Sequence, residues 1–212
     1  ATSNVTVWVN GKQVGYAEDS KVESEYELTK YLVPGKKNLI ALQVMRWCDG
    51  SYGEDQDFWR FTGIAREVYL YSRPTSHIAD YFAVPDLTND YRDGQLSVKV
   101  SAVKAAGLTV KAEIKDGNNN VAAQDILLDK VGKGETTLNV SHPRKWTAET
   151  PNLYTCVIRI RDEKMQLIET VGTRFAFRKV EVKEGMLQVN GTPINLRGVI
   201  YTNTDMATYE QD

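Results

Sequence analysis

The fold class is decided first by residues 5–16, which read Val5-Thr-Val-Trp-Val-Asn-Gly-Lys-Gln-Val-Gly-Tyr16. Valines stand at every second position before Asn10-Gly11, and a second alternating run follows that pair. Period-two alternation is typical of a strand with one buried face. Asn-Gly favours a two-residue type I′ turn between antiparallel strands. The stretch therefore predicts a β-hairpin.

Further strands are predicted in the rest of the first 74 residues. After a Pro-Gly turn, Asn38–Trp47 contains a continuous apolar run that predicts a strand buried on both faces. Polar, glycine-containing residues predict a loop over 49–57. Arg66–Ser72 predicts another strand, which Pro74 ends because proline has no N–H to donate to a ladder. Four or so strands are too few for two packed sheets, so we expect an incomplete domain.

Residues 75–180 carry short strand-like runs at regular intervals, separated by turn sequences such as Asp93-Gly94. The predicted strands cover residues 77–84, 95–103, 108–115, 121–128, 135–140, 153–161 and 165–178. Seven strands in about a hundred residues are typical of an immunoglobulin-like β-sandwich. Beyond it, Met186–Val189 and Ile194–Leu196 flank a second Asn-Gly pair and predict one more hairpin. No long amphipathic helix is expected, so the predicted fold class is all-β.

Composition argues against two classes of partner. The 212 residues carry a formal net charge of -2, with Lys and Arg scattered along the chain, and so give no field to hold nucleic-acid phosphates. No apolar run approaches the roughly 18 residues that a membrane span needs. Cys48 and Cys156 are far apart, and two buried thiols are favoured over a disulfide. The compartment stays open between cytoplasm and periplasm.

The acidic cluster of Glu54, Asp55 and Asp57 could supply an acid/base pair for catalysis. Arg60 and Arg66 lie close in sequence, however, and such clusters in loops are more often solvated or ion-paired than catalytic. We therefore expect no catalytic role for this cluster.

Isolated aromatic and histidine residues give weaker signals. Trp47 and Trp59 could stack on a sugar, although a core or interface position is favoured for both. Trp146 is expected to pack within its own domain. His77 and His142 are separated from each other and from Cys or paired carboxylates, so they give little support for a metal site.

Three segments of the chain resemble glycoside hydrolase family 2. The strings Trp8–Tyr16, Arg46–Tyr52 and 54–60 are similar to the family's sugar-binding jelly-roll domain. The family's immunoglobulin-like domain is resembled by Pro143, Trp146, Glu149, Pro151–Tyr154, Gly172, Arg174 and Phe177-Arg178. Asn190-Gly191 with Leu196–Val199 resembles the lead into the family's TIM barrel.

The resemblance implies three regions. These are the C-terminal part of a jelly-roll sandwich over 1–74, an immunoglobulin-like sandwich over 75–180, and a truncated TIM-barrel start over 181–212 with a short hairpin leading into it. The tail from Ile200 to Asp212 is too poor in apolar residues to fold alone. Within it, Ile200–Asn203 departs from the family pattern.

The string over 46–60 is most similar to that of the long, multidomain bacterial β-galactosidases. The resemblance implies a non-catalytic portion of an enzyme that hydrolyses terminal β-D-galactosides by a retaining two-glutamate mechanism. Both glutamates would lie in a barrel absent from this chain, so no catalytic residue and no cofactor are expected here. Sodium, magnesium and homo-oligomerisation are expected of the full-length enzyme.

Asp49 is the candidate site residue. By resemblance, the aspartate of the matching Trp-x-Asp-Gly-Ser motif contacts galactose and helps to coordinate sodium. An ionised carboxylate accepts charge-assisted hydrogen bonds from sugar hydroxyls and suits an alkali cation. An Asx turn is the alternative, because Asp before Gly is common turn chemistry.

Two other functions stay open for the chain, a stand-alone carbohydrate-binding module and a structural spacer. The spacer suits residues 75–180 but not the first 70.

Overall fold

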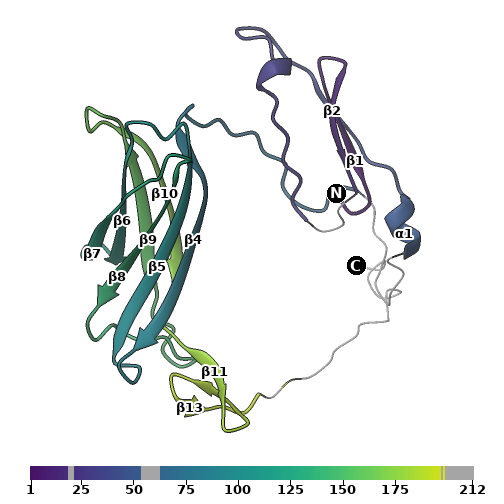
Figure 1. Cartoon of the computed structure of the whole chain (residues 1–212). Helices are drawn as coiled ribbons and strands as arrows, with labels where there is room; N and C mark the ends of the chain where they lie inside the picture. Colours follow the sequence, from purple (N-terminus) through teal and green to yellow (C-terminus); the bar gives the residue numbers. More distant parts are fainter. Residues whose placement is uncertain (19–21, 54–62, 197, 199–212) are drawn as a thin grey trace. The chain divides into compact units, whose positions relative to one another are not determined.

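The chain folds as two units whose regular secondary structure consists almost entirely of β-strands (Figure 1). The structure is a computed structural model that describes residues 1–18, 22–53, 63–196 and 198. The first unit spans Ala1–Tyr71 and the second Ser72–Asp212. The all-β prediction is confirmed, since the described residues contain only two single-turn helices, η1 (Thr29–Tyr31) and α1 (Asp49–Gly53).

The predicted hairpin organises the first unit. β1 (Val5–Val9) pairs antiparallel with β2 (Lys12–Ala17), and Val9 lies opposite Lys12 across the turn. Asn10 and Gly11 both have positive φ, 51° and 79°, as a type I′ turn requires. The three valines of β1 are buried on one face. The alternation in the sequence therefore corresponds to the buried side of this strand.

β3 (Ile40–Gln43) is shorter than the predicted strand over Asn38–Trp47, and the prediction that it is buried on both faces is wrong. It pairs with β1 alone and so lies at the edge of a three-stranded sheet of order β2-β1-β3. Three of its four residues are exposed. The apolar run is exposed because no second layer among the described residues covers this edge strand.

The predicted strand over Arg66–Ser72 is also wrong. These residues form no strand, and the side chains of Val68–Tyr71 are exposed. Alternation of apolar residues gives a segment the potential to pair, but a strand exists only where another backbone supplies hydrogen-bond partners. No described strand supplies them to this segment.

The Asn10 side chain extends the pairing of the first sheet beyond its turn. The Asn10 N–H donates to Leu39 O at 2.9 Å, and the Leu39 N–H donates to Asn10 Oδ1 at 3.0 Å. Asn10 Nδ2 donates to Tyr31 O at 3.0 Å and to Asn38 Oδ1 at 2.7 Å. One turn residue thus joins the hairpin to the segment before β3.

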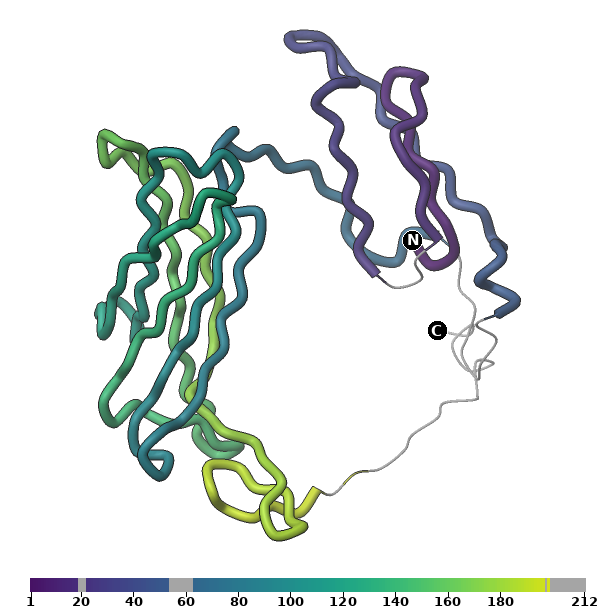
Figure 2. The backbone as a smooth tube through the Cα atoms, in the orientation of Figure 1, coloured from purple at the N-terminus to yellow at the C-terminus, as the bar shows by residue number. Residues whose placement is uncertain are grey.

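The second unit is a two-layer sandwich whose seven predicted strands are all present (Figures 1 and 2). They are β4 (His77–Thr88), β5 (Asp93–Val103), β6 (Thr109–Asp116), β7 (Asn119–Ile126), β8 (Lys133–Val140), β9 (Tyr154–Arg161) and β10 (Leu167–Phe175). One sheet has the order β4-β5-β8 and the other β10-β9-β6-β7. This arrangement is that of an immunoglobulin-like sandwich. Its core contains fully buried side chains from both sheets, including Leu96 and Ile158.

A third, small sheet follows the sandwich. β11 (Val180–Lys183), β12 (Met186–Val189) and β13 (Thr192–Pro193) pair in that order. The predicted second hairpin is confirmed at Asn190-Gly191, although its second strand lies at Thr192–Pro193 rather than at Ile194–Leu196. β11 is an additional strand that the sequence did not predict.

The start of the second unit is held by an ion pair. Arg73 Nε lies 2.9 Å from Glu169 Oε1, and the Ile78 N–H donates to Glu169 Oε2 at 2.8 Å. Partial burial acts to raise the pKa of Glu169, but hydrogen bonds from Arg73 and Ile78 outweigh it and leave the pKa below its usual value. The Glu169 carboxylate therefore stays charged and connects β10 to the beginning of β4.

Both cysteines are free, so no disulfide links them. Cys156 is fully buried in β9, as predicted, and burial raises the pKa of its thiol to about 11. The prediction is wrong for Cys48, which is only half-buried because it lies between β3 and α1 rather than in a core strand.

Candidate functional site

Buried polar side chains at the start of the chain position the segment that carries Asp49. The Met45 N–H donates to Asn4 Oδ1 at 3.0 Å, and Ser3 Oγ donates to Met45 O. Ser3 and Asn4 are buried, so these hydrogen bonds are shielded from competing water. The backbone is therefore fixed immediately before Arg46.

The segment then turns into α1, at whose first position Asp49 stands. The Cys48 N–H donates to Ser51 Oγ at 3.1 Å, and the Ser51 N–H donates to Cys48 O at 3.0 Å. The Asp49 side chain is exposed and takes part in no hydrogen bond or ion pair within the described residues. Asp49 therefore does not close an Asx turn there, because its carboxylate accepts no backbone N–H.

Two aromatic residues, Trp47 and Tyr52, flank Asp49 in the sequence. The Trp47 and Tyr52 ring centroids lie 6.3 Å apart, with their planes inclined by 30°. Trp47 is 46% exposed and Tyr52 76% exposed, so of the core or interface position favoured for Trp47 the core alternative is wrong, and the interface alternative stays a prediction. The Arg46 guanidinium carbon lies 5.4 Å from the centroid of the Trp47 ring. Residues 46–52 thus combine a carboxylate, a guanidinium and two accessible aromatic rings.

Sequence reasoning missed Tyr52 and Arg46 as neighbours of this site. A five-residue spacing between two aromatics fits neither a strand face nor a helix face. Trp47 and Tyr52 come close to each other through the turn closed by Ser51. The polar run after Asp49 was the one feature of the sequence that indicated this turn. The acidic cluster of 54–57 and Trp59 lie outside the described residues.

The other predicted candidates are structural. Trp146 packs within the second unit, as predicted, since its N–H donates to Phe177 O at 3.0 Å and Arg178 Cζ lies 4.6 Å from its ring centroid. His77 Nδ1 lies 2.8 Å from Pro74 O. The His142 N–H donates to Asp93 Oδ1 at 3.3 Å. Among the described residues, no three His, Cys, Asp or Glu side chains gather as a metal site would require.

The donor chemistry of residues 46–53 suits sodium to a limited extent. Asp49 offers an exposed hard oxygen ligand of the kind that alkali cations accept. It is the one acidic side chain in this segment. A complete coordination sphere therefore needs further oxygen ligands beyond this carboxylate.

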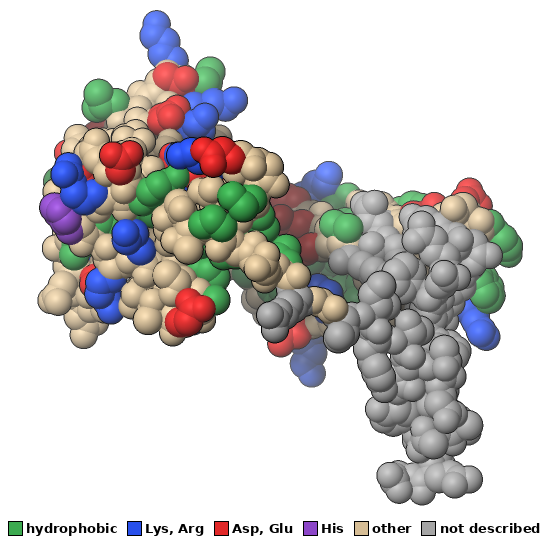
Figure 3. Space-filling view, turned by 90° about the horizontal axis from the view of Figure 1, so that it is seen from below, with side chains coloured by type: hydrophobic (Ala, Val, Ile, Leu, Met, Phe, Trp, Pro, Cys, Tyr) green, Lys and Arg blue, Asp and Glu red, His purple; other side chains and the backbone are tan. Residues whose placement is uncertain are grey.

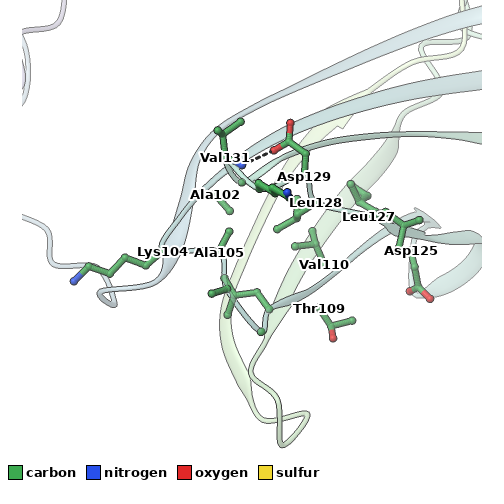
Figure 4. Close-up of a pocket in the computed structure, with 16 residues that line it drawn as sticks. Ala102, Lys104, Ala105, Thr109, Val110, Asp125, Leu127, Leu128, Asp129 and Val131 are labelled. Carbon is green, nitrogen blue, oxygen red and sulfur yellow. Dashed lines mark hydrogen bonds between the residues drawn. The ribbon is translucent and has the colours of Figure 1, made fainter.

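A separate pocket of about 800 Å³ lies at one end of the sandwich, between the β5–β6 and β7–β8 connections (Figure 4). Its walls include Ala102, Val110 and Leu128. Asp129 also lines it, but Asp129 Oδ1 accepts hydrogen bonds from Val131 N at 2.9 Å and Lys133 N at 2.8 Å. These two hydrogen bonds give the Asp129 carboxylate a structural role within its own loop.

The described side chains show no field of one charge on the face drawn in Figure 3. Acidic and basic side chains are interspersed over the face seen in Figure 3. No helix in the described part of the chain is long and apolar enough to cross a membrane.

Comparisons with known proteins point to one family. Residues 1–74 match the family description "Glycosyl hydrolases family 2, sugar binding domain", and residues 76–178 match "Glycosyl hydrolases family 2". The chain is 42% identical over 203 residues to a β-galactosidase of Vibrio vulnificus, which covers 91% of this chain and 20% of that protein. It is 41% identical over 211 residues to a β-galactosidase of Aeromonas hydrophila, covering 95% and 20%. The chain thus spans about a fifth of the length of these relatives.

Solved structures show the same architecture. A β-glucuronidase of Bacteroides uniformis superimposes with a TM-score of 0.81 at 25% identity, covering 94% of this chain and 26% of that one. A glycosyl hydrolase family 2 member from Bacteroides cellulosilyticus gives 0.78 at 23% identity, covering 92% and 28%. The second likeness concerns the fold alone.

Proposed function

Because this chain belongs to glycoside hydrolase family 2, we propose that it is a non-catalytic portion of a β-galactosidase. In this proposal the whole protein hydrolyses terminal β-D-galactosides with retention of configuration. One glutamate acts as nucleophile and another as acid/base. Both belong to a TIM barrel outside these 212 residues, so the chain alone has no activity.

The observation that carries the proposal is the 42% identity to a β-galactosidase over nearly the whole chain. The solved β-glucuronidase relative is less similar in sequence, at 25% identity. Closer sequence similarity to β-galactosidases supports a galactoside over a glucuronide as the substrate of the parent protein. Magnesium dependence and homo-oligomerisation are part of the same proposal, with no described residue assigned to either.

We propose that Asp49 contributes to the galactose site of the parent enzyme. Its exposed carboxylate, free of partners in the described part of the chain, can accept hydrogen bonds from two sugar hydroxyls. The hydrogen bonds around Ser51 fix the backbone on which it stands. A sodium ion bound through the same carboxylate would neutralise its charge and orient it toward the sugar.

The test compares Asp49→Asn with Asp125→Asn in the full-length parent. Asp125 is an exposed residue of β7, so its substitution makes the same change of charge away from the proposed site. Loss of a charge-assisted hydrogen bond should raise KM for a nitrophenyl galactoside about tenfold or more and weaken the response to sodium. Asp125→Asn should leave both unchanged. Identical sodium titrations for Asp49→Asn and the unsubstituted enzyme would remove Asp49 from the site.

A stand-alone carbohydrate-binding module is the second candidate, and the exposed Trp47 and Tyr52 rings, close to Asp49 in sequence, favour it. Aromatic rings can cover the apolar C–H face of a sugar while a carboxylate binds its hydroxyls. Calorimetric titration of galactose into this chain in sodium buffer separates the two candidates. Saturable binding that is lost in Asp49→Ala supports the module. No binding, together with no turnover of a nitrophenyl galactoside, supports the enzyme portion.

A further inference from the structure

The small sheet β11–β13 contacts the sandwich through the turn that connects β4 to β5. Gly191, in the β12–β13 turn, has a φ of 78°, and a Cβ added there would lie 2.5 Å from Cε2 of the Tyr91 ring. Such a distance is far shorter than any van der Waals contact. Glycine is therefore required at this position for the ring and the turn to approach so closely.

The Tyr91 ring cannot easily move aside. It packs against the buried core of the sandwich, and its hydroxyl donates a hydrogen bond to Glu181 on β11. This hydrogen bond is the main cause that raises the pKa of Tyr91. The ring is thus held by the sandwich on one side and by the small sheet on the other.

The turn that presents Tyr91 is strained. Asn89, Asp90 and Tyr91 have consecutive positive φ values of 51°, 54° and 61°. Left-handed backbone is unfavourable for a residue with a Cβ, and such strain persists only where surrounding contacts fix it. Here Asn89 Nδ2 donates to Asp93 Oδ2 at 2.7 Å, and the Arg92 N–H donates to Asn89 O at 3.2 Å.

Asn190 joins the two parts through Trp146 and also bonds Lys179, which directly precedes β11. Its Nδ2 donates to Trp146 O at 2.9 Å, and its Oδ1 accepts from the Lys179 N–H at 2.9 Å. Lys179 Nζ in turn lies 3.3 Å from Asp86 on β4. The small sheet is therefore connected to the sandwich at several points, in addition to the covalent chain.

We infer that the Tyr91 turn and the Asn190-Gly191 turn form a fixed joint, which sets the direction in which the chain leaves the sandwich after β13. Tyr91, Asn190 and Gly191 are positioning residues in this sense. That the joint places a catalytic barrel rests on the proposed function. The rigidity of the joint itself is independent of the proposed function.

The β11–β12 turn provides a matched control. Glu184-Gly185 has φ values of 53° and 76°, close to the 53° and 78° of Asn190-Gly191, but a Cβ at Gly185 would meet nothing within 4 Å. Alanine at either glycine incurs the same left-handed strain, because the two φ values differ by only 2°. Only Gly191→Ala also displaces Tyr91.

Residual dipolar couplings of backbone amides in the whole 212-residue chain test the inference. The unsubstituted chain and Gly185→Ala should give one alignment tensor for the sandwich and β11–β13 together. Gly191→Ala should keep the couplings of the sandwich but scale down those of β11–β13 at least twofold, as independent motion averages them. A single common tensor in Gly191→Ala, or two separate tensors in the unsubstituted chain, would overturn the joint.

A second variant keeps the test decisive if Gly191→Ala fails to fold. Tyr91→Leu removes the ring contact and the hydroxyl donor without introducing a clash. Reduced β11–β13 couplings in this variant support the joint, and retained couplings overturn it. Neither result depends on sugar binding or turnover, so failure of the joint is distinguishable from failure of the proposed function.

Discussion

Replacing Leu96 with alanine should destabilise the sandwich by about 3 to 4 kcal/mol. Leu96 is 0% exposed and lies on β5, the central strand of its sheet. The three carbons removed contribute about 0.8 kcal/mol each, or about 2.4 kcal/mol. β4 and β8 hold the β5 backbone from both sides, so the site cannot close fully, and the remaining cavity adds about 0.5 to 1.5 kcal/mol.

Leu167→Ala makes the same chemical change at a position of different burial. Leu167 begins β10 and is 53% exposed. Its side chain gains little from folding, so the expected loss is below about 1 kcal/mol. The difference between the two variants therefore measures burial rather than the intrinsic cost of alanine in a strand.

Each unit carries one cysteine, which allows the unfolding of the sandwich to be followed alone. In a Cys48→Ser background, Cys156 is the single thiol, and it is fully buried. Urea-dependent labelling of Cys156 by a thiol reagent then reports the opening of the second unit. Since 1.4 kcal/mol corresponds to a factor of ten, Leu96→Ala should speed native-state labelling roughly a hundredfold to a thousandfold. Labelling within about tenfold of Leu167→Ala would refute the argument that neighbouring strands keep the cavity open.

Two further predictions concern a close packing contact and a buried thiol. A Cβ at Gly15 would lie 2.4 Å from Tyr26 Cε1, so Gly15→Ala should destabilise the first unit by about 1 to 3 kcal/mol. Hydrogen exchange of the β1 and β2 amides should then become faster, and unchanged exchange would contradict this packing. Because burial raises the pKa of Cys156 from 9.0 to about 11, the folded state keeps a proton that the unfolded state loses, and stability should fall as pH rises through that interval. Urea midpoints at several pH values should show this fall to be smaller in Cys156→Ala, and equal slopes would contradict it.

The strands of the sandwich could be predicted because each carries its own local signal. In β5, apolar residues alternate from Leu96 to Ala102, and the strand starts at an Asp-Gly turn sequence. β11 was not predicted because its four residues, Val180–Lys183, give a short alternation with no Asn-Gly turn sequence beside it, whereas the equally short β12 precedes Asn190-Gly191. The opposite error arose at 66–72, where the alternation is clear but no described strand pairs with it. Strand pairing depends on residues that are distant in the sequence, whereas the alternation of apolar residues describes only the segment itself.

The candidate site could be predicted only at its motif residue. Asp49 came from a string resembling a known family, and its exposure agrees with a ligand-binding carboxylate. The side chains that fix its backbone, Ser3 and Asn4, contact Met45 from more than forty positions away in sequence. No spacing rule connects such residues, and Trp47 and Tyr52 come together only through a turn that forms in three dimensions.

The two Asn-Gly turns also determine how the protein should age. Asn10 and Asn190 each use the side-chain amide to bond a neighbouring segment, with Nδ2 donating to Tyr31 O in one case and to Trp146 O in the other. Asparagine followed by glycine is chemically labile, because the following backbone nitrogen is unhindered and can attack the amide. Deamidation would replace each donor by a carboxylate oxygen facing a carbonyl. Storage would then loosen both units through the same reaction, which peptide mass mapping of aged protein would detect as an acidic residue at position 10 or 190.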